Sequence, residues 1–431
     1  MPSGLVEAFA APARRAADDG EGRMLKRPRT LWSSRANTPG HSFGLYERDV
    51  CGAWEERLDM AQERSDFNAS QWVDAQYRRY FRMDRATFNR FLTAYAYLFP
   101  GDDSTCRWRP VVGTYKRVCV LLNWLATGIS YAQLGAVFDL SRAEVCKIVH
   151  EGVDVLWKVL VKDEVRFPET SLELLETCRG FYGLCSLPAL DGTFVKINKP
   201  GKDIVRFSDV YFCYKKYCAI IVLAAVDSLG LFTYVSAGAP GSAGDASTWN
   251  HCDLKEDIDA EKLLVLDEPE LRQLHQWAGF QLKRPYIVAD TAFALSPTLM
   301  KCYDVANPTQ PQFNFNYSVI RTRRVVECAF GRLKARWQIL KDNKLSDPKF
   351  ASKIATVCCA LHNFIERGVT RLDNQLFMVP QDLPEFVPSD NVSVDRRRER
   401  NVGALTLRDN LATTAAAEPL RAVTRNEVPA P

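Results

Sequence analysis

The 431-residue chain lacks several features that mark common classes of protein. No apolar run reaches the length of about 18 residues that a membrane-spanning helix needs, so we expect no membrane span. The N-terminus lacks the basic and then apolar pattern of a secretory signal. Histidine is scarce, with 5 residues, and none of the 13 cysteines forms a Cys-x-x-Cys pair, which argues against a zinc site. We therefore expect reduced, mostly buried cysteines in an intracellular protein.

The hydrophobic content of 47% allows a sizeable core, and the length predicts two or three domains. Residues 1–42 are rich in Ala, Arg, Gly, Pro and Ser without periodicity, which predicts a disordered basic tail. The basic cluster at 26–29 is compatible with a nuclear import signal, with a phosphate-contacting arm, and with a solvated tail that does neither. Residues 376–431 are predicted to be mostly disordered as well.

Residues 43–165 follow a helical pattern, with Asp84 as an N-cap. Within this region, residues 130–150 have the sequence pattern of a helix-turn-helix. Ser130 can cap a short first helix, an apolar turn follows, and Ser141 with Glu144 forms a capping box for the second helix.

The second of these helices would expose two basic side chains, Arg142 and Lys147, while Val145, Ile148 and Val149 face inward. A helix with such a face can enter the major groove of DNA, so both basic residues are candidate DNA contacts. An ordinary helical hairpin is the alternative, because the exposed face is only modestly basic.

Residues 187–197 indicate a β-strand with an acid near its middle, Asp191. A carboxylate in an apolar strand is costly unless positive charge compensates it, and a metal ion is one such charge. The alternative is an Asp-Gly turn between two hairpin strands, which is the commonest meaning of that dipeptide.

Two near-continuous apolar runs follow, at 217–227 and 231–236, and the turn residues between them predict a hairpin. A loop rich in Gly, Pro and Ala is expected at 237–244. It ends at Asp245, which is a candidate N-cap for the next helix.

A fourth strand is predicted at 285–290 and ends on Asp290, at the carboxyl end where sites form in α/β sheets. Residues 321–342 predict a strongly amphipathic helix that contains Glu327, and a further helix is expected at 353–366. This order of strands, helices and acids is that of the ribonuclease-H-like fold. We therefore expect an α/β catalytic domain at 175–370, preceded by the all-α helix-turn-helix region.

Five motifs between about residues 80 and 370 resemble those of the PIF/Harbinger transposases and of the host nucleases derived from them. The motifs are Asp191-Gly-Thr, Pro240-Gly-Ser with Asp245, Ala289-Asp290-Thr-Ala-Phe, Arg323-Arg-Val-Val-Glu327-Cys-Ala-Phe-Gly-Arg-Leu-Lys334-Ala-Arg336-Trp, and Leu361-His-Asn-Phe364. Each motif is weak alone, but five in the order of the family are a strong signal.

The resemblance implies a D-D-E set of carboxylates that binds divalent metal, expected to be two Mg²⁺ or Mn²⁺ ions. It assigns Asp191, Asp290 and Glu327 as catalytic residues and metal ligands. Asp245 is also characteristic of the family and joins the expected metal ligands. Either aspartate can be the second catalytic acid. The alternatives are a helix cap for Asp245 and a strand-end turn residue for Asp290.

Bacterial relatives carry an arginine four residues before the glutamate and a lysine seven after it, and Arg323 and Lys334 stand at these offsets. With Arg336, they are the expected DNA contacts of this helix. A solvated helix face is the alternative reading of these charges.

The sequence thus predicts a metal-dependent DNA endonuclease or transposase with double-stranded DNA as its partner. A host-adopted relative that binds DNA or protein without transposing is the alternative. The resemblance implies a separate Myb-like DNA-binding partner, and action on two DNA ends would suggest a homodimer. We expect the protein in the nucleus, with the cytoplasm as a second location.

Overall fold

The computed structural model describes residues 69–99, 112–181, 184, 186–278, 282–341, 345–368 and 401–417. The chain forms two compact units, and the described part of the larger one lies within Lys162–Leu333 and Lys344–Pro431. The other comprises Pro12–Val161 and Lys334–Asn343. The expected N-terminal tail lies outside the described residues, and the predicted domain boundaries stay predictions.

The smaller unit is helical in its described part. Its helices are α2 (Ala69–Phe81), α3 (Arg85–Tyr95), η1 (Ala96–Leu98), α4 (Thr114–Thr127), α5 (Tyr131–Phe138), α6 (Arg142–Lys158), the first residues of α7 (Leu160–Glu164), and η3 (Gln338–Leu340). Asp84 caps α3 as predicted, because its carboxylate accepts a hydrogen bond from the Thr87 N–H at 2.7 Å. Helix α4 lies at the centre of this unit, with Val118 to Ala126 buried.

Helices α5 and α6 are joined by a turn of three residues, and Asp139 in this turn adopts a positive φ of 50°. Ser130 and Gln133 form a full capping box at the start of α5. At the start of α6, the Ser141 hydroxyl accepts from the Glu144 N–H at 3.1 Å. The second hydrogen bond of the predicted capping box would run from the Ser141 N–H to the Glu144 carboxylate. That carboxylate instead forms an ion pair with Arg117, whose guanidinium lies 3.9 Å away.

The larger unit is built on a five-stranded mixed sheet with the order β3-β2-β1-β4-β5. Its strands are β1 (Ala189–Lys196), β2 (Ala219–Val226), β3 (Phe232–Pro240), β4 (Ile287–Val288) and β5 (Leu299–Met300). Strand β2 is antiparallel to both β1 and β3, whereas β4 is parallel to β1 and β5 is parallel to β4. This confirms a mixed α/β architecture.

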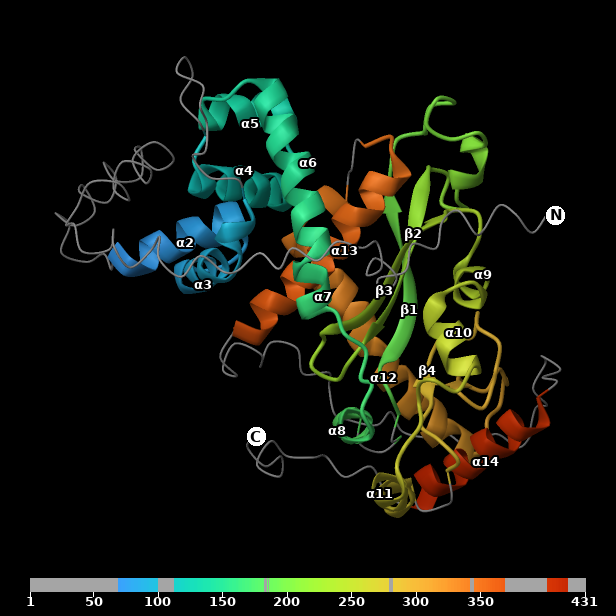
Figure 1. Cartoon of the computed structure of the whole chain (residues 1–431). Coiled ribbons are helices and arrows are strands. Elements are labelled where there is room, and N and C mark those ends of the chain that lie inside the picture. The colour runs from blue at the N-terminus through green and yellow to red at the C-terminus, as the bar shows by residue number, and fades with distance from the viewer. Residues whose placement is uncertain are drawn as a thin grey trace. The chain divides into compact units, whose positions relative to one another are not determined.

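Helices cover both faces of the sheet, which explains why all eight residues of β2 are buried. Figure 1 shows α12 (Gln310–Arg336) and α13 (Pro348–Gly368) on one side, with α9 (Asp245–Asn250) and α10 (Asp253–Asp259) on the other. The remaining elements of this unit are α8 (Ser171–Gly180), η2 (Ser208–Tyr211), α11 (Glu268–Ala278) and α14 (Val402–Ala417).

Helix α12 begins at Gln310, eleven residues before the predicted start, and ends at Arg336. A reciprocal pair of hydrogen bonds between Thr309 and Gln312 marks its beginning. This is the Thr-x-x-Gln form of the capping box. The apolar periodicity of the sequence is clear only further along, which explains the late predicted start.

The loop predicted at 237–244 is shorter in the structure, because β3 continues to Pro240. Gly244 is the N-cap of α9, with a positive φ of 76°, and Asp245 is the first helical residue. The prediction that Asp245 is the N-cap is therefore wrong. Its carboxylate is left to face the site described below.

The C-terminal tail, expected to be mostly disordered, contains helix α14. Arg408 of this helix is buried with its guanidinium 4.1 Å from the centre of the Tyr303 ring. The Tyr303 hydroxyl also donates to Asp409 at 2.7 Å. These polar contacts fix the helix on the larger unit, where composition alone indicated a polar tail.

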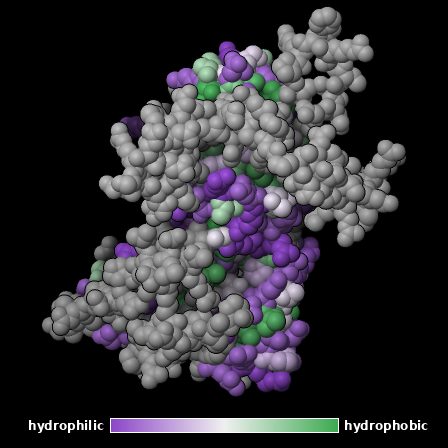
Figure 2. Space-filling view, turned by 90° about the vertical axis from the view of Figure 1, so that its left-hand side faces the viewer, coloured by the Kyte–Doolittle hydropathy of each residue, from purple (hydrophilic) through white to green (hydrophobic). Residues whose placement is uncertain are grey.

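All ten described cysteines are free thiols and seven of them are buried, as expected. In the described part of the chain, no helix combines the length and the apolar character that a membrane crossing requires. Figure 2 shows one face of the molecule, on which hydrophilic side chains dominate the described surface and hydrophobic ones form small separate groups.

Candidate active site

The register of the sheet brings two of the predicted acids together. Strands β1 and β4 are parallel and pair at Ala189 and Val288. Asp191 and Asp290 each lie two residues beyond this pair, on strands that run in the same direction. Because neighbouring strands lie about 4.8 Å apart, the two acids occupy adjacent positions at the carboxyl end of β4.

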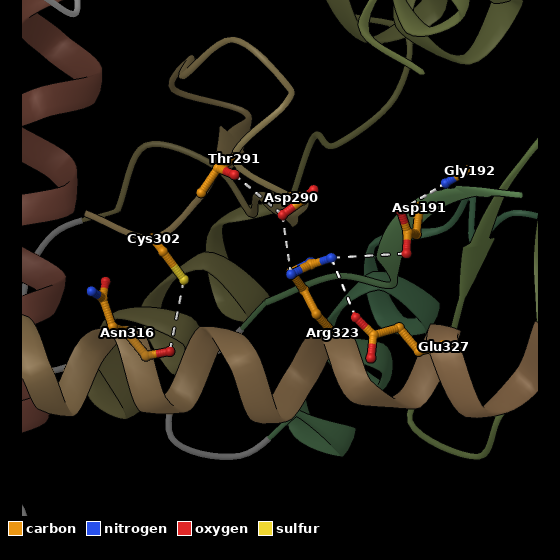
Figure 3. A network of polar contacts seen from close by, with 8 residues as sticks. All are labelled: Asp191, Gly192, Asp290, Thr291, Cys302, Asn316, Arg323 and Glu327. Carbon is orange, nitrogen blue, oxygen red and sulfur yellow. Dashed lines mark hydrogen bonds and ion pairs between the residues drawn. The ribbon is translucent and has the colours of Figure 1, made fainter. Parts of the chain in front are cut away.

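Helix α12 adds a positively charged side chain, Arg323, and a third carboxylate, Glu327, to the same place. One terminal nitrogen of Arg323 lies 3.2 Å from the Asp290 carboxylate. Its other terminal nitrogen lies 3.8 Å from the Asp191 carboxylate and 3.4 Å from that of Glu327. Figure 3 shows the guanidinium between the three carboxylates. Since Arg323 and Glu327 are one helical turn apart, the helix presents both to the strand ends.

Asp245 reaches the site from the opposite side of β1. A Cβ atom built on Gly192 would lie only 2.1 Å from Oδ1 of Asp245, so this carboxylate packs directly against the Gly192 backbone. Side chains alternate along a strand, and Asp191 and Gly192 therefore face α12 and α9 respectively. The Asp-Gly pair of the sequence is explained by this packing, because any side chain at 192 would displace Asp245.

Burial is the main influence on Asp191. The side chain is only 17% exposed, and loss of solvent raises the pKa of the carboxyl from 3.8 to about 6. The Gly192 N–H, which donates to Asp191 Oδ1 at 2.8 Å, and the charge of Arg323 both oppose this rise. The negative charges of Asp245 and Asp290 add to it. The site thus holds more negative charge than Arg323 alone compensates.

The pKa of Asp245 is raised as well, first by burial and then by repulsion from Asp290. The ammonium group of Lys215, in the connection between β1 and β2, lowers it in part. Three carboxylates from separate segments, those of Asp191, Asp245 and Asp290, therefore repel one another beside β1. Glu327 is joined to them through Arg323.

The donor chemistry of this cluster fits a hard divalent cation, because carboxylate oxygens are the ligands that Mg²⁺ and Mn²⁺ prefer. The convergence of three carboxylates on one guanidinium shows that the place attracts positive charge. Within the described ranges, no group of three or more His, Cys, Asp or Glu side chains forms a ready-made ion-holding set. To hold an ion, the carboxylates would have to come closer together, and the ion would compensate their negative charge in place of Arg323.

The predicted basic residues lie in different settings. Arg142 and Lys147 are exposed on α6, while Lys334 and Arg336 are half-buried in the last turns of α12, in the part assigned to the smaller unit. Arg323 was predicted as a phosphate contact, but its side chain is only 15% exposed and faces the acids. Its burial among carboxylates is the physical reason for this placement.

Sequence reasoning missed two residues that shape the site. Lys215 acts on Asp245, and the signal that could have indicated it is the Tyr-Lys-Lys run between two predicted strands. Gly241, which was recognised only as part of a family motif, lets the backbone at Tyr211 and Ala219 approach closely, since a Cβ would lie 2.6 Å and 2.9 Å from their carbonyl oxygens.

Asn363 of the Leu-His-Asn-Phe motif has a structural role. Its side-chain amide donates to the Phe232 and Glu164 carbonyls at 2.8 Å each and accepts from the Phe232 N–H at 2.8 Å. It therefore fastens α13 to the start of β3 and to the end of α7. The motif holds the sheet in place and does not itself line the acids.

Comparison with known proteins bears on this site. Residues 190–363 match a family model described as DDE superfamily endonuclease. Protein ALP1-like of Arabidopsis thaliana is 25% identical over 303 residues, which cover 66% of this chain and 69% of that protein. Protein Antagonist of Like Heterochromatin Protein 1, from the same plant, is 26% identical over 254 residues, or 58% of this chain and 62% of that protein.

No solved structure matches the chain significantly. The family match begins at Leu190, next to Asp191, and ends at Asn363, so it encloses all four acids and Arg323. Residues 190–363, the part of the chain that holds this site, are therefore similar to the DDE superfamily endonucleases.

Proposed function

We propose that this protein is a divalent-metal-dependent DNA endonuclease that cuts phosphodiester bonds at the Asp191, Asp290 and Glu327 site. The observation that supports it best is the convergence of four carboxylates, from β1, α9, the end of β4 and α12, around the central strand β1. A purely structural role would not require Asp245 and Asp290 to lie where their charges raise the pKa of Asp191.

Asp191, Asp290, Glu327 and Asp245 would hold the metal. When bound, two divalent ions make an attacking oxygen nucleophilic and stabilise the leaving oxygen. The chain itself orients Asp191 through the Gly192 N–H and places Asp290 beside it by strand register. Arg323 keeps the carboxylates together, and its guanidinium can pair with a DNA phosphate once they take up another partner.

We assign the larger unit to the ribonuclease-H-like fold. The sheet order, with three antiparallel strands followed by two parallel ones, supports the assignment. So does the position of the acids on the first strand, after the fourth strand and on α12.

Helices α5 and α6 form the proposed helix-turn-helix that contacts double-stranded DNA. Arg142 at the start of α6 and Lys147 are exposed, while Val145, Ile148 and Val149 are buried against the rest of the smaller unit. This is the division of faces that a recognition helix needs. Replacing Arg142 and Lys147 with glutamine should weaken DNA binding and reduce its salt dependence. Unchanged affinity and salt slope would refute this role.

A host-adopted binding factor that does not cut DNA is the second candidate. Two observations favour it. One relative is named as an antagonist of another protein, which is not a description of a nuclease. The site also has its own cation, Arg323, between three of its acids, so part of their negative charge is compensated without metal.

Nicking of supercoiled plasmid in Mg²⁺ or Mn²⁺ separates the two candidates. The native chain is compared with Asp191→Asn, Asp245→Asn, Asp290→Asn and Glu327→Gln, and with the exposed Asp203→Asn as a matched control. We expect EDTA and each catalytic variant to stop the nicking while Asp203→Asn cuts like the native chain. The variants at 245 and 290 then identify the second catalytic aspartate.

The nuclease proposal fails if the folded native protein binds DNA but does not cut it, even with a Myb-like partner supplied.

We further propose a nuclear location, a Myb-like partner and a homodimer acting on two DNA ends. Imaging of the tagged chain, co-purification and the mass of the DNA complex in light scattering test these three points. A chain found in the cytoplasm would refute the nuclear location, and a purification that recovers no Myb-like protein would refute the partner. A DNA complex with the mass of one protein chain would refute the homodimer.

A further inference from the structure

The connection between β1 and β2 carries an unusual surface. Residues 196–217 contain six lysines or arginines against two aspartates. Large aromatic side chains are exposed at four described positions, and three of them, Phe207, Phe212 and Tyr214, lie in this connection. Tyr214 is 78% exposed, which is the largest value among the exposed large hydrophobic residues of the described chain.

The end of this connection, residues 212–216, is here named the aromatic–lysine turn. The Cys213 N–H donates to the Tyr217 carbonyl at 2.9 Å, and the Lys216 N–H donates to the Cys213 carbonyl at 2.9 Å. Lys216 adopts a positive φ of 64° to close the turn. These bonds hold Tyr214 outward on a defined backbone, which lowers the entropic cost of binding to it.

The residues on either side of the aromatic–lysine turn are hydrogen-bonded to the segment that leads to Asp245. The Ser242 N–H donates to the Val210 carbonyl at 3.0 Å, and the Gly241 N–H donates to the Ala219 carbonyl at 2.9 Å. Gly241 has no side chain to prevent this approach. Because Asp245 follows three residues after Ser242, the same contacts position the turn and one acid of the site.

Phe194 connects the turn to the catalytic strand. It lies on β1 three residues after Asp191 and on the same face as Gly192, against which Asp245 packs. The Phe194 and Tyr214 rings meet edge to face, with centroids 5.5 Å apart. The ammonium group of Lys215 lies 5.3 Å from the centre of the first ring and 5.7 Å from that of the second.

An aromatic face beside lysines is the combination that proteins use to bind single-stranded nucleic acid, by stacking on bases and pairing with phosphates. We propose that Tyr214 and Lys215 bind an unpaired nucleotide of the DNA strand that enters the acid site, with Tyr214 stacking on its base. This rests on the proposed function, and it specifies the substrate as DNA that is single-stranded beside the cut. The positive turn and the negative DNA strand are complementary in charge.

The test uses the full-length protein in EDTA, so that binding is measured without cutting. One probe is a DNA duplex with a single-stranded overhang, and the other is a fully paired duplex of the same core sequence. Fluorescence anisotropy gives both affinities for the native chain, Tyr214→Ala, Tyr214→Trp and the control Tyr97→Ala. Tyr97 is also an exposed aromatic, at 56%, but it lies in the other unit.

We expect Tyr214→Ala to weaken binding of the overhang duplex about tenfold, within the range that loss of one base stack produces. Binding of the paired duplex should change less than about twofold, because its bases are not available for stacking. Tyr214→Trp should keep the native affinity, and Tyr97→Ala should leave both affinities unchanged. Lys215→Gln should weaken both probes and reduce the salt slope by about one unit.

Equal losses of affinity for both probes in Tyr214→Ala would overturn the proposal. Native affinity for both probes would overturn it as well, and this is the result expected if the turn binds a protein partner. Circular dichroism excludes misfolding as the cause. The nuclease proposal is judged separately by plasmid nicking. If the protein nicks DNA but its DNA binding does not depend on Tyr214, only the stacking proposal is refuted. If the protein never nicks DNA but its binding does depend on Tyr214, only the nuclease proposal is refuted.

Discussion

Replacing Asp191 with asparagine should stabilise the metal-free protein at neutral pH, although it removes a group that we propose to be catalytic. The carboxyl has a pKa of about 6 in the folded protein, against an ordinary value of 3.8. A group whose pKa is higher when folded binds more protons in the folded state, so its ionisation costs stability as the pH rises through this interval. Asparagine keeps the shape of the protonated carboxyl and avoids that cost.

The expected gain follows from the pKa difference. About two pKa units, at 1.36 kcal/mol each, correspond to roughly 3 kcal/mol of unfolding free energy at pH 7.5. For a unit of this size, the gain is a rise of roughly 6–12 °C in Tm. The favourable contact with Arg323 is already included, because it is one of the influences on the pKa of Asp191.

Thermal unfolding in EDTA, followed by circular dichroism, measures this effect. The native chain, Asp191→Asn and the exposed control Asp203→Asn are compared at pH 7.5 and at pH 4. The gain from Asp191→Asn should be present at pH 7.5 and nearly absent at pH 4, where the native carboxyl is protonated. A gain of the same size at both pH values, or a loss at pH 7.5, would refute the electrostatic reasoning. Adding Mn²⁺ should narrow the difference in Tm, because the proposed site would bind the ion more tightly with Asp191 than with asparagine.

Three further substitutions follow from the structure. Gly192→Ala should displace Asp245 and reduce plasmid nicking on the order of 100-fold, whereas Gly331→Ala, whose Cβ meets no atom within 4 Å, should cut normally; equal activities would contradict this packing. Asn363→Ala loses three hydrogen bonds to the main chain and should lower the unfolding free energy by roughly 3 kcal/mol in urea; a loss below about 1 kcal/mol would show that these bonds are replaced. Arg323→Gln should lower Tm in EDTA by leaving three carboxylates uncompensated, and Mn²⁺ should restore it more than it raises the native Tm; a deficit unaffected by metal would argue that Arg323 and the ion do not share a place.

Local signals in the sequence were sufficient where the structure is decided by near neighbours. The strand around Asp191 corresponds to β1, and Asp84 and Ser130 cap helices α3 and α5 as predicted. Each of these features depends on residues within a few positions of one another. The hairpin at 227–230 is formed for the same reason, because Asp227 accepts hydrogen bonds from two N–H groups of its own turn.

Features that depend on distant contacts could not be read from the chain. The place of Asp245 is fixed by the positive φ of Gly244 and by packing against Gly192, which is more than 50 positions away. Arg323 was expected to contact DNA because it stands four residues before Glu327, at the offset of an arginine in bacterial relatives. Only the pairing of β1 with β4 shows that two acids meet beside it. The family motifs named the acids, but the sheet register explains why they are neighbours.

The two units are interleaved along the chain, and this limits how the protein can be divided. Helix α12 carries Arg323 and Glu327 in the larger unit, but its last three residues and the chain that follows belong to the smaller one, as part of Lys334–Asn343. Trp337, Ile339 and Leu340 are buried there, and η3 packs against α4. A fragment limited to the family match would expose these side chains. Recombination that replaced the N-terminal helices would also strip them of their cover, so the acid site and the helical region are expected to be inherited together as one evolutionary module.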